Sequence, residues 1–510
     1  MNKNKLSDMQ IKEFWKEYSR FYKTGLNTET PHPKTYNLSQ LAQSNLTQAL
    51  QLFQELELET IEKIKENISS IIELQQSINN CFKNNNKVFL IGCGASGRLC
   101  MLLKRLWELS NPDNSKQIIS ICAAGDVSLI KSIEQFEDKP DFGIKQLLQQ
   151  GFSKNDLLIG LTASGESPFI LAAISHAAKI SRYKPWLVFN NSISSLLLRN
   201  PKHIVNTHDI QSLALNIGPM ALTGSTRLQA TSAMQVALGL ALLHHKNNDF
   251  LNEIDNIYNT IKSFPLINLA PITDKETEIF LKKEFILYET NNIILGLNLL
   301  ADLTERSPTF NLPPFENNNE ANQIFSPFYL SLTNIKNSKE AWNFLLGQDP
   351  ICLNWENFPK TTLSYIEGFD LSKNSLRAIS NYLPSTQHRE VWQIKNNLLK
   401  IQLDDIYVKF QIIPQNILQA SLIYKLCLNA HSTIMMGRVG NFEGNLMLSL
   451  NPTNFKLIDR AIRYSQFLLK KHHNLNIDYK VVAEVTFQEI ENLKSNESIV
   501  KKVVNRFLVD

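Results

Sequence analysis

Lys87-Val-Phe-Leu-Ile-Gly-Cys-Gly-Ala-Ser-Gly-Arg-Leu99 is a short apolar run that stops at three closely spaced glycines. The apolar residues predict a buried parallel strand, and the residues after the glycines predict a helix that begins near Arg98. Because glycines let the backbone turn sharply, the start of this helix can direct amide N–H groups at a bound anion, with the Ser96 hydroxyl beside them. The alternative is a plain strand-to-helix turn, since glycine-rich turns are common in α/β proteins.

Two later segments repeat this combination of glycine and hydroxyl groups. Residues 156–168 form an apolar strand pattern that runs into Thr-Ala-Ser-Gly-Glu-Ser-Pro, and residues 222–228 read Leu-Thr-Gly-Ser-Thr-Arg-Leu before a long apolar helix. In an open α/β sheet the carboxyl ends of parallel strands face one crevice, so three such loops can surround one anion. None of the loops contains the Gly-Lys-Ser/Thr of a triphosphate-binding loop. The pattern therefore indicates a phosphate monoester, such as a sugar phosphate.

The composition predicts a soluble multidomain protein and argues against several other classes. The chain has 510 residues, 43% of them hydrophobic, and its net charge of +4 comes from 52 basic and 48 acidic residues. That balance argues against a nucleic-acid or membrane-surface partner. The six cysteines form no CxxC pair, so we expect no metal site and no disulfide framework. No apolar leader or membrane-spanning run occurs, and we expect a cytoplasmic protein without a cofactor.

Five motifs occur along the first half of the chain. They are residues 92–99 (Gly-Cys-Gly-Ala-Ser-Gly-Arg-Leu), 124–126 (Ala-Gly-Asp), 134–138 (Glu-Gln-Phe-Glu-Asp), 162–168 (Thr-Ala-Ser-Gly-Glu-Ser-Pro) and 218–227 (Gly-Pro-Met-Ala-Leu-Thr-Gly-Ser-Thr-Arg). In this order they resemble the sugar isomerase (SIS) domain of N-acetylmuramate 6-phosphate etherases and of glucokinase regulatory proteins. Residues 425–433 and 444–463 resemble the C-terminal helical part of the same families.

The resemblance implies an α/β fold with two flavodoxin-like SIS domains, each a parallel sheet with helices on both faces, and a C-terminal helical cap. The expected divisions are an N-terminal arm at residues 1–47, a first SIS domain with the phosphosugar loops at 48–245, a degenerate second SIS domain at 246–425 and a helical region at 426–510.

An internal repeat supports the two-domain expectation. When Asn291 is set opposite Gly92, Gly296 falls opposite Gly97, although the second copy has lost the glycine loop. Residues 302–310 (Asp-Leu-Thr-Glu-Arg-Ser-Pro-Thr-Phe) resemble a signature that etherases carry just after their own glycine loop. Two copies that each miss what the other keeps indicate a former homodimer fused into one chain, a monomer with one composite site.

The resemblance also assigns residues to that site. The phosphate-binding candidates are Gly94, Ala95, Ser96 and Gly97 in the first loop, Thr162, Ala163, Ser164, Gly165 and Glu166 in the second, and Ser225 or Thr226 in the third. Glu134 matches the position of the etherase general base and Glu305 that of the general acid, while Lys456 and Arg460 match a basic pair that reaches the phosphosugar in the regulatory proteins. The structural alternatives are a capping or ion-paired role for the acidic residues and a solvated helix face for the Lys/Arg pair.

Three functions remain open at this point. The fused layout favours a phosphosugar-binding regulator with a partner such as a sugar kinase, ahead of an etherase that releases lactate and, third, a sugar-phosphate isomerase. Met220, Gln229 and Ala95 stand where the family usually carries polar or acidic residues, which weakens the etherase hypothesis.

In the remaining sequence, residues 362–369 and 406–413 are predicted as strands. His431 has no orienting acid nearby in the sequence and is interpreted as a helix-packing residue.

Overall fold

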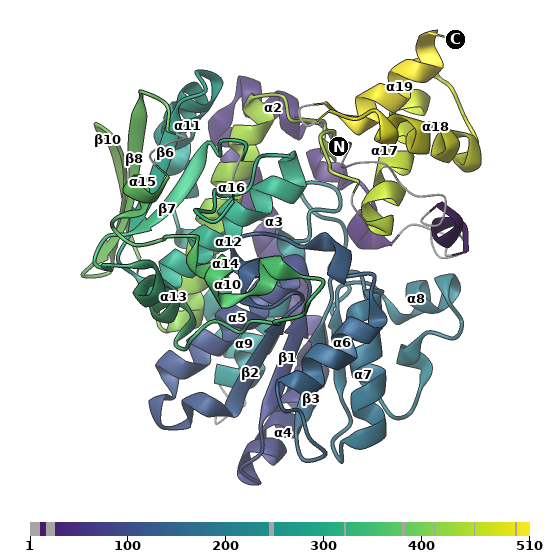
Figure 1. Ribbon diagram of the computed structural model, residues 1–510, viewed down its shortest axis with the longest axis vertical. Coiled ribbons are helices and arrows are strands. Elements are labelled where there is room, and N and C mark those ends of the chain that lie inside the picture. The colour runs from purple at the N-terminus through teal and green to yellow at the C-terminus, as the bar shows by residue number, and fades with distance from the viewer. Residues whose placement is uncertain are drawn as a thin grey trace.

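The computed structural model describes residues 11–16, 26–243, 249–320, 323–379, 383–412, 414–452, 454–494 and 497–509. It consists of two five-stranded sheets with a layer of helices between them, a short two-stranded sheet, and a C-terminal group of helices at one end of the molecule (Figure 1). The predicted fold class, an α/β protein with two sheets and a helical C-terminal region, is confirmed.

The first sheet is wholly parallel, with the strand order β2-β1-β3-β4-β5 that is typical of flavodoxin-like folds. Its strands are β1 (Val88–Gly92), β2 (Ile118–Cys122), β3 (Leu157–Leu161), β4 (Trp186–Phe189) and β5 (Gln211–Ala214). The helices in this part of the chain are α2 (Leu38–Ser44), which packs on α3 and α16 (Ile417–Arg438), and α3 (Leu46–Ile64), α4 (Ile68–Lys83), α5 (Gly94–Ser110), α6 (Pro140–Gln149), α7 (Pro168–Ile180), α8 (Ile193–Arg199) and α9 (Gln229–Leu243).

The strands of this sheet are buried on both faces. Successive side chains of a strand point to opposite faces, so Val88 and Leu90 pack in the core cluster with α4 and α5, while Phe89 and Ile91 pack in the cluster with α6 and α7. Such double burial explains why the strand reads as a continuous apolar run in the sequence.

The second sheet is mixed, which differs from the predicted parallel sheet. Its order is β10-β9-β8-β6-β7, in which β6 (Phe285–Thr290), β7 (Phe328–Leu332) and β8 (Gln387–Lys395) run parallel, while β9 (Leu398–Leu403) and β10 (Ile406–Gln411) run antiparallel to their neighbours. Asn396 and Asn397 join β8 to β9, both with positive φ, in the two-residue turn that connects antiparallel strands.

Helices of the second domain are α10 (Phe250–Ser263), α11 (Ala270–Leu281), α12 (Ile293–Phe310), α13 (Ser338–Leu346), α14 (Leu363–Glu367), α15 (Ser375–Ala378) and α16 (Ile417–Arg438). The strand predicted at residues 362–369 is therefore wrong, since α14 occupies it, whereas β10 confirms the strand predicted at 406–413. Helix α12 begins 199 residues after α5, the offset of the predicted repeat, and the repeat itself stays a prediction.

The C-terminal region contains the short strands β11 (Phe442–Glu443) and β12 (Leu446–Met447), followed by α17 (Phe455–His473), α18 (Tyr479–Glu491) and α19 (Ile499–Val509). These three helices pack on one another, and Figure 1 shows them in yellow beside the first domain. A domain boundary at residue 425 would divide the continuous helix α16, so the proposed division needs to move to the end of that helix.

Within the described ranges, no helix has the length and apolar character needed to cross a membrane.

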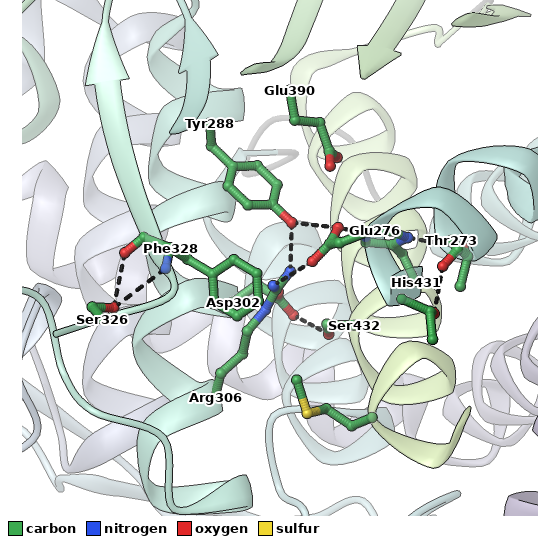
Figure 2. Close-up of polar contacts among 12 residues, drawn as sticks. Thr273, Glu276, Tyr288, Asp302, Arg306, Ser326, Phe328, Glu390, His431 and Ser432 are labelled. Atoms are coloured by element: carbon green, nitrogen blue, oxygen red, sulfur yellow. Dashed lines mark hydrogen bonds and ion pairs between the residues drawn. The ribbon is translucent and has the colours of Figure 1, made fainter. Parts of the chain in front are cut away.

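A buried ion-pair network anchors α12 to the second sheet (Figure 2). The Arg306 guanidinium lies 2.9 Å from Glu276 Oε1 on α11 and 3.0 Å from Asp302 Oδ2 one helical turn earlier, and it donates to the Tyr288 hydroxyl of β6 at 3.1 Å. All four side chains are almost fully buried. Charges removed from water are tolerated only when they are paired and hydrogen-bonded, so these elements depend on one another.

His431 of α16 belongs to the same network. Its Nε2 is in contact with Glu276, and its Nδ1 lies 2.8 Å from the Thr273 hydroxyl. The interpretation of His431 as a packing residue without an acidic partner is therefore wrong, because α11 brings Glu276 to it from 155 positions away in the sequence. Burial raises the pKa of Glu276, but His431 and Arg306 more than offset this and hold its pKa well below the usual range.

The close approach of α5 to β2 gives a first prediction. A Cβ on Gly97 would lie 2.3 Å from Cys122 Sγ and 2.8 Å from the Gly92 carbonyl oxygen, whereas the atoms nearest a Cβ on Gly296 would be side-chain methyl carbons of Leu345 at 3.1 Å, Leu332 at 3.4 Å and Thr290 at 3.6 Å. We expect Gly97→Ala to destabilise the protein by about 1–3 kcal/mol, because the backbone oxygen cannot give way. Gly296→Ala should be neutral or stabilising, since alanine favours a helix. Urea-induced unfolding would measure both, and equal midpoints would contradict the prediction.

The buried network gives a second prediction. Glu276→Gln should destabilise the protein by about 3 kcal/mol, because it leaves Arg306 without one of its two buried carboxylate partners. A carboxylate with a lowered pKa stabilises the fold above its unfolded-state pKa, so the wild type should lose this contribution as the pH falls, and the variant should have less to lose. The control is Glu59→Gln, which removes an exposed partner of Lys34. An equal effect of both substitutions on the unfolding midpoint would refute the assignment.

Candidate functional site

Two adjoining hollows lie where the three predicted loops meet α17, and they share Cys93, Glu137, Thr226 and Lys456. We call them together the front cavity. The larger has a volume of about 540 Å³ including its open mouth, which is within the range of small-molecule sites. Of the predicted site residues, those that line it are Gly94, Ala95, Ser96, Thr162, Ala163, Ser164, Ser225, Thr226, Glu305, Lys456 and Arg460.

The first loop is shorter than predicted, because α5 begins at Gly94 and not near Arg98. The Ser96 and Gly97 amides donate to the Cys93 carbonyl oxygen at 3.1 and 3.2 Å, which forms the first turn of the helix. Gly97 packs against Cys122 and is not among the residues that line the front cavity. Its role is the close packing of helix and strand, while Ala95 and Ser96 lie at the cavity wall.

The second loop is held in shape by its own hydroxyl groups. The Gly165 amide donates to Thr162 Oγ1 at 3.3 Å, and the Glu166 amide donates to Ser164 Oγ at 3.2 Å. The amide predicted to bind phosphate at Gly165 is therefore engaged within the loop. Glu166 forms a two-bond ion pair with Arg199, at 2.7 and 3.1 Å, and does not line the front cavity.

The third loop presents an unsatisfied hydroxyl. Ser225 is 4% exposed, and its Oγ has no hydrogen-bond partner among the described residues although it lies on the cavity wall. Arg227, two residues later, fixes the loop from behind, because its guanidinium lies 2.6 Å from Asp302 Oδ1 on α12. A buried hydroxyl without a partner costs free energy, so its presence at a cavity points to a ligand atom.

Glu305 comes from the second domain and reaches the first. It pairs with Arg98 of α5, and the two side chains are 13% and 2% exposed. Arg98 also contacts the Ser128 carbonyl oxygen and donates to Ser132 Oγ at 3.2 Å, so the guanidinium position is fixed. Glu134 lies in a short 3-10 helix, Glu134–Phe136, and its side chain is outside the part of the chain that the structure describes.

Helix α17 brings the predicted basic pair to the cavity. Lys456 Nζ lies 2.9 Å from Glu137 Oε1, and the Arg460 guanidinium holds both oxygens of Glu29 at 3.0 and 2.9 Å while donating to the Gly224 carbonyl oxygen at 2.9 Å. Burial lowers the pKa of Arg460, but Glu29 more than offsets this and raises it. The two cations therefore join the C-terminal region to the loops of the first domain and do not form a solvated face.

Several contacts of the cavity could not be found from the sequence. Glu29 and Arg98 carry no motif signal for the partners they make, because these partners are 431 and 207 positions away. Glu137 lies inside the 134–138 motif, which is the signal that could have identified it.

Two of the three residues that depart from the family pattern do not line the front cavity. Met220 Sδ accepts from the Ala230 amide at 3.2 Å, and Gln229 Oε1 accepts from the Ala221 amide at 2.9 Å.

Within the described residues, the group able to hold a metal ion consists of Glu276, Glu390 and His431. It lies in the second domain and does not line the front cavity. Arg306 occupies one oxygen of Glu276, and the repulsion between this guanidinium and a divalent ion opposes metal binding there. The chemistry available in the front cavity is that of hydroxyls, amides, carboxylates and two cations.

Comparison with known proteins identifies part of the chain. Residues 70–178 match the family described as the glucokinase regulatory protein N-terminal SIS domain. N-acetylmuramic acid 6-phosphate etherases are similar to this chain: that of Clostridium acetobutylicum is 26% identical over 215 residues, which cover 42% of this chain and 67% of that protein. The corresponding protein of Prochlorococcus marinus (strain NATL2A) is 32% identical over 202 residues, covering 40% of this chain and 62% of that protein.

Among solved structures, the tagatose-6-phosphate ketose/aldose isomerase from Escherichia coli overlaps with a TM-score of 0.43 at 10% identity, covering 79% of this chain and 97% of that chain. A likeness this low has no bearing on the isomerase alternative. The matched segments span about two thirds of the etherases' own length. Residues 70–178 thus match an SIS domain of the glucokinase regulatory protein type, and about two fifths of the chain is similar to N-acetylmuramic acid 6-phosphate etherases.

Proposed function

We propose that the front cavity binds a phosphate ester of an amino sugar and that the protein cleaves an ether substituent of this ligand, the reaction for which its curated relatives are named. The observation that carries the proposal is the partnerless Ser225 hydroxyl on a wall that Lys456 and Arg460 also line. Hydroxyl donors and fixed cations recognise phosphate oxygens through short, charge-assisted hydrogen bonds. Phosphate binding is common to the etherase and the regulator, and the similarity to N-acetylmuramic acid 6-phosphate etherases is what supports the etherase hypothesis over the regulator that the fused layout favours.

The proposed reaction needs two carboxyl groups in different protonation states. One carboxylate takes the proton from C2 of the ring-opened sugar, where the C1 aldehyde makes it acidic. The electron pair forms a C2–C3 double bond as the C3–oxygen bond breaks, and a carboxylic acid gives its proton to the departing lactyl oxygen. Water then adds at C3 and C2 regains a proton. We assign the base to Glu134 and the acid to Glu305, which requires the Glu305–Arg98 pair to open when substrate binds.

The internal bonds of Met220 and Gln229 support this order of hypotheses. Their departure from the family pattern weakens the etherase hypothesis, but both side chains form hydrogen bonds away from the front cavity. Ala95 is the departure that does touch the cavity, where it leaves space in place of a polar side chain.

A ligand-gated regulator is the second candidate, and the contacts of α17 favour it. Lys456 and Arg460 are held by Glu137 and Glu29, carboxylates with which a bound phosphate would compete. A ligand that takes over these cations favours one arrangement of α17 against the first domain over another. A partner protein such as a sugar kinase could then distinguish the two arrangements, and differential affinity would be the whole mechanism.

Binding can be tested at Ser225 without disturbing the fold. Ser225→Ala removes no internal hydrogen bond, so the unliganded melting temperature should not change. The affinity for N-acetylglucosamine 6-phosphate, measured by calorimetry, should fall by roughly tenfold, because a hydrogen bond to a charged group is lost. Thr223→Val is the matched control, since Thr223 Oγ1 is also buried without a partner but lies off the cavity. Equal affinities in the two variants would contradict the proposed phosphate site.

Lactate release tests the chemistry. The purified chain should release lactate from N-acetylmuramate 6-phosphate, and Glu305→Gln should slow this by at least about 100-fold, because it removes the proton donor. Glu340→Gln on α13, which does not line the front cavity, should keep the wild-type rate. A chain that binds the sugar phosphate and releases no lactate would overturn the etherase proposal in favour of the regulator.

A further inference from the structure

A second cavity adjoins the front cavity, and Ala95 and Glu305 line both. We call it the rear cavity. It has a volume of about 540 Å³ including its open mouth and lies between the four helices that separate the two five-stranded sheets, α5, α9, α12 and α16. Much of its wall is apolar and is formed by Leu99, Leu102, Leu129, Leu297 and Leu428. A group attached to a sugar bound in front could enter it beside Glu305.

Among the described residues, one hydrogen-bond acceptor of the rear cavity is buried without a partner. Gln235 is fully buried, and its Nε2 donates to Ser421 Oγ at 3.0 Å, but its Oε1 accepts no hydrogen bond. A buried carbonyl oxygen left in this state points to a donor that a ligand or a ligand-bound water supplies. The cavity therefore shows a specific requirement for a polar ligand atom among its leucine side chains.

Lys425 offers the cavity a hydrogen-bond donor and a positive charge, whereas Gln235 offers an acceptor. Its ammonium has three N–H donors, of which two go to the Leu228 carbonyl oxygen at 3.0 Å and to Ser232 Oγ at 2.6 Å. Among the described residues no carboxylate lies within ion-pair distance of this ammonium. The third donor and the charge are therefore available to the cavity that Lys425 lines.

In the unliganded structure, the other two cations of the rear cavity are both ion-paired. Arg98 pairs with Glu305, and Arg227 pairs with Asp302. Lys425 thus differs from both arginines. Each arginine forms an ion pair across the domain interface, whereas Lys425 forms no ion pair among the described residues. An anionic ligand group that enters this cavity while the Glu305–Arg98 pair is still closed would find its counter-charge at Lys425, with apolar side chains around the rest of the group.

We propose that the rear cavity receives the carboxylate-bearing ether substituent of the substrate and that Lys425 selects it, with the methyl group of a lactyl ether against the leucine wall. This proposal rests on the proposed binding of an amino-sugar phosphate in the front cavity. It makes Lys425 a specificity-determining residue, which distinguishes a lactyl ether of the sugar phosphate from the same sugar phosphate with a free C3 hydroxyl.

The test compares two ligands that differ in the lactyl group alone, N-acetylmuramate 6-phosphate and N-acetylglucosamine 6-phosphate. Affinities are measured by calorimetry on the full chain carrying Glu134→Gln, which prevents turnover under the proposed mechanism. We expect the lactyl ligand to bind more tightly, and Lys425→Met to weaken it by roughly 10- to 100-fold, the loss of one charged hydrogen bond, with no change for the lactyl-free ligand. Lys425→Arg should keep part of the preference, because it keeps the charge.

Lys456→Met is the matched control, because Lys456 lines the front cavity and should weaken both ligands equally. If neither ligand binds, the proposed function fails. If both bind equally, or if Lys425→Met weakens both by the same factor, the rear-cavity proposal fails and the front-cavity proposal stands. A melting temperature of unliganded Lys425→Met near that of the parent chain would show that the substitution leaves the fold intact.

The pH dependence of the preference is an independent readout. Burial lowers the pKa of Lys425 to about 8, while Glu57 of α3 and Asp302 of α12 raise it and Arg227 lowers it. The ammonium is charged below that pH and neutral above it, so the preference for the lactyl ligand should decline as the pH rises through about 8. A preference that does not change across this range would contradict the assignment to Lys425.

Discussion

Asp302 binds two buried arginines, and this double ion pair joins the halves of the molecule. Arg227 comes from the third loop of the first domain at 2.6 Å, and Arg306 comes from the next turn of the same helix as Asp302 at 3.0 Å. Arg306 also pairs with Glu276 of α11 at 2.9 Å and donates to the hydroxyl of Tyr288, in β6 of the second sheet, at 3.1 Å. Charges this deeply buried are stable only as a complete set, so the loop, α12 and the second sheet hold fixed positions relative to one another.

This constraint explains how a helix of the second domain supplies a side chain to a cavity of the first. Glu305 lies in α12 between Asp302, which pairs with Arg227 of the first domain, and Arg306, which pairs with Glu276. Because these two ion pairs fix the helix, the Glu305 side chain reaches Arg98 of α5. The front cavity and the rear cavity adjoin at this part of α12, and Glu305 lines both of them. A carboxyl group at such a boundary can meet the bond between a sugar and its ether substituent, which is the basis of both proposals.

Local sequence patterns predicted much of the first domain, because its strands are buried on both faces and its loops carry glycines at required positions. The second sheet was harder to predict. The Asn396-Asn397 turn reverses the chain after β8, and an asparagine pair is a weaker turn signal than Asn-Gly. Residues 362–369 have an apolar pattern too short to distinguish strand from helix, and α14 occupies them. Glu166 was assigned to the phosphate, yet Arg199 from α8 engages it.

The sequence by itself determined the glycine loop, the hydroxyl-rich loops and the family resemblance, because each is encoded by residues close together in the chain. Only the tertiary structure decided which of these side chains meet. Glu29 with Arg460, Arg98 with Glu305, and His431 with Glu276 are pairs of residues more than 150 positions apart. Spacing along the chain carries no information about such contacts, since they depend on how whole helices pack. Helix packing likewise brings Lys425, which forms no ion pair among the described residues, into one cavity with the side-chain carbonyl oxygen of Gln235, which accepts no hydrogen bond from them.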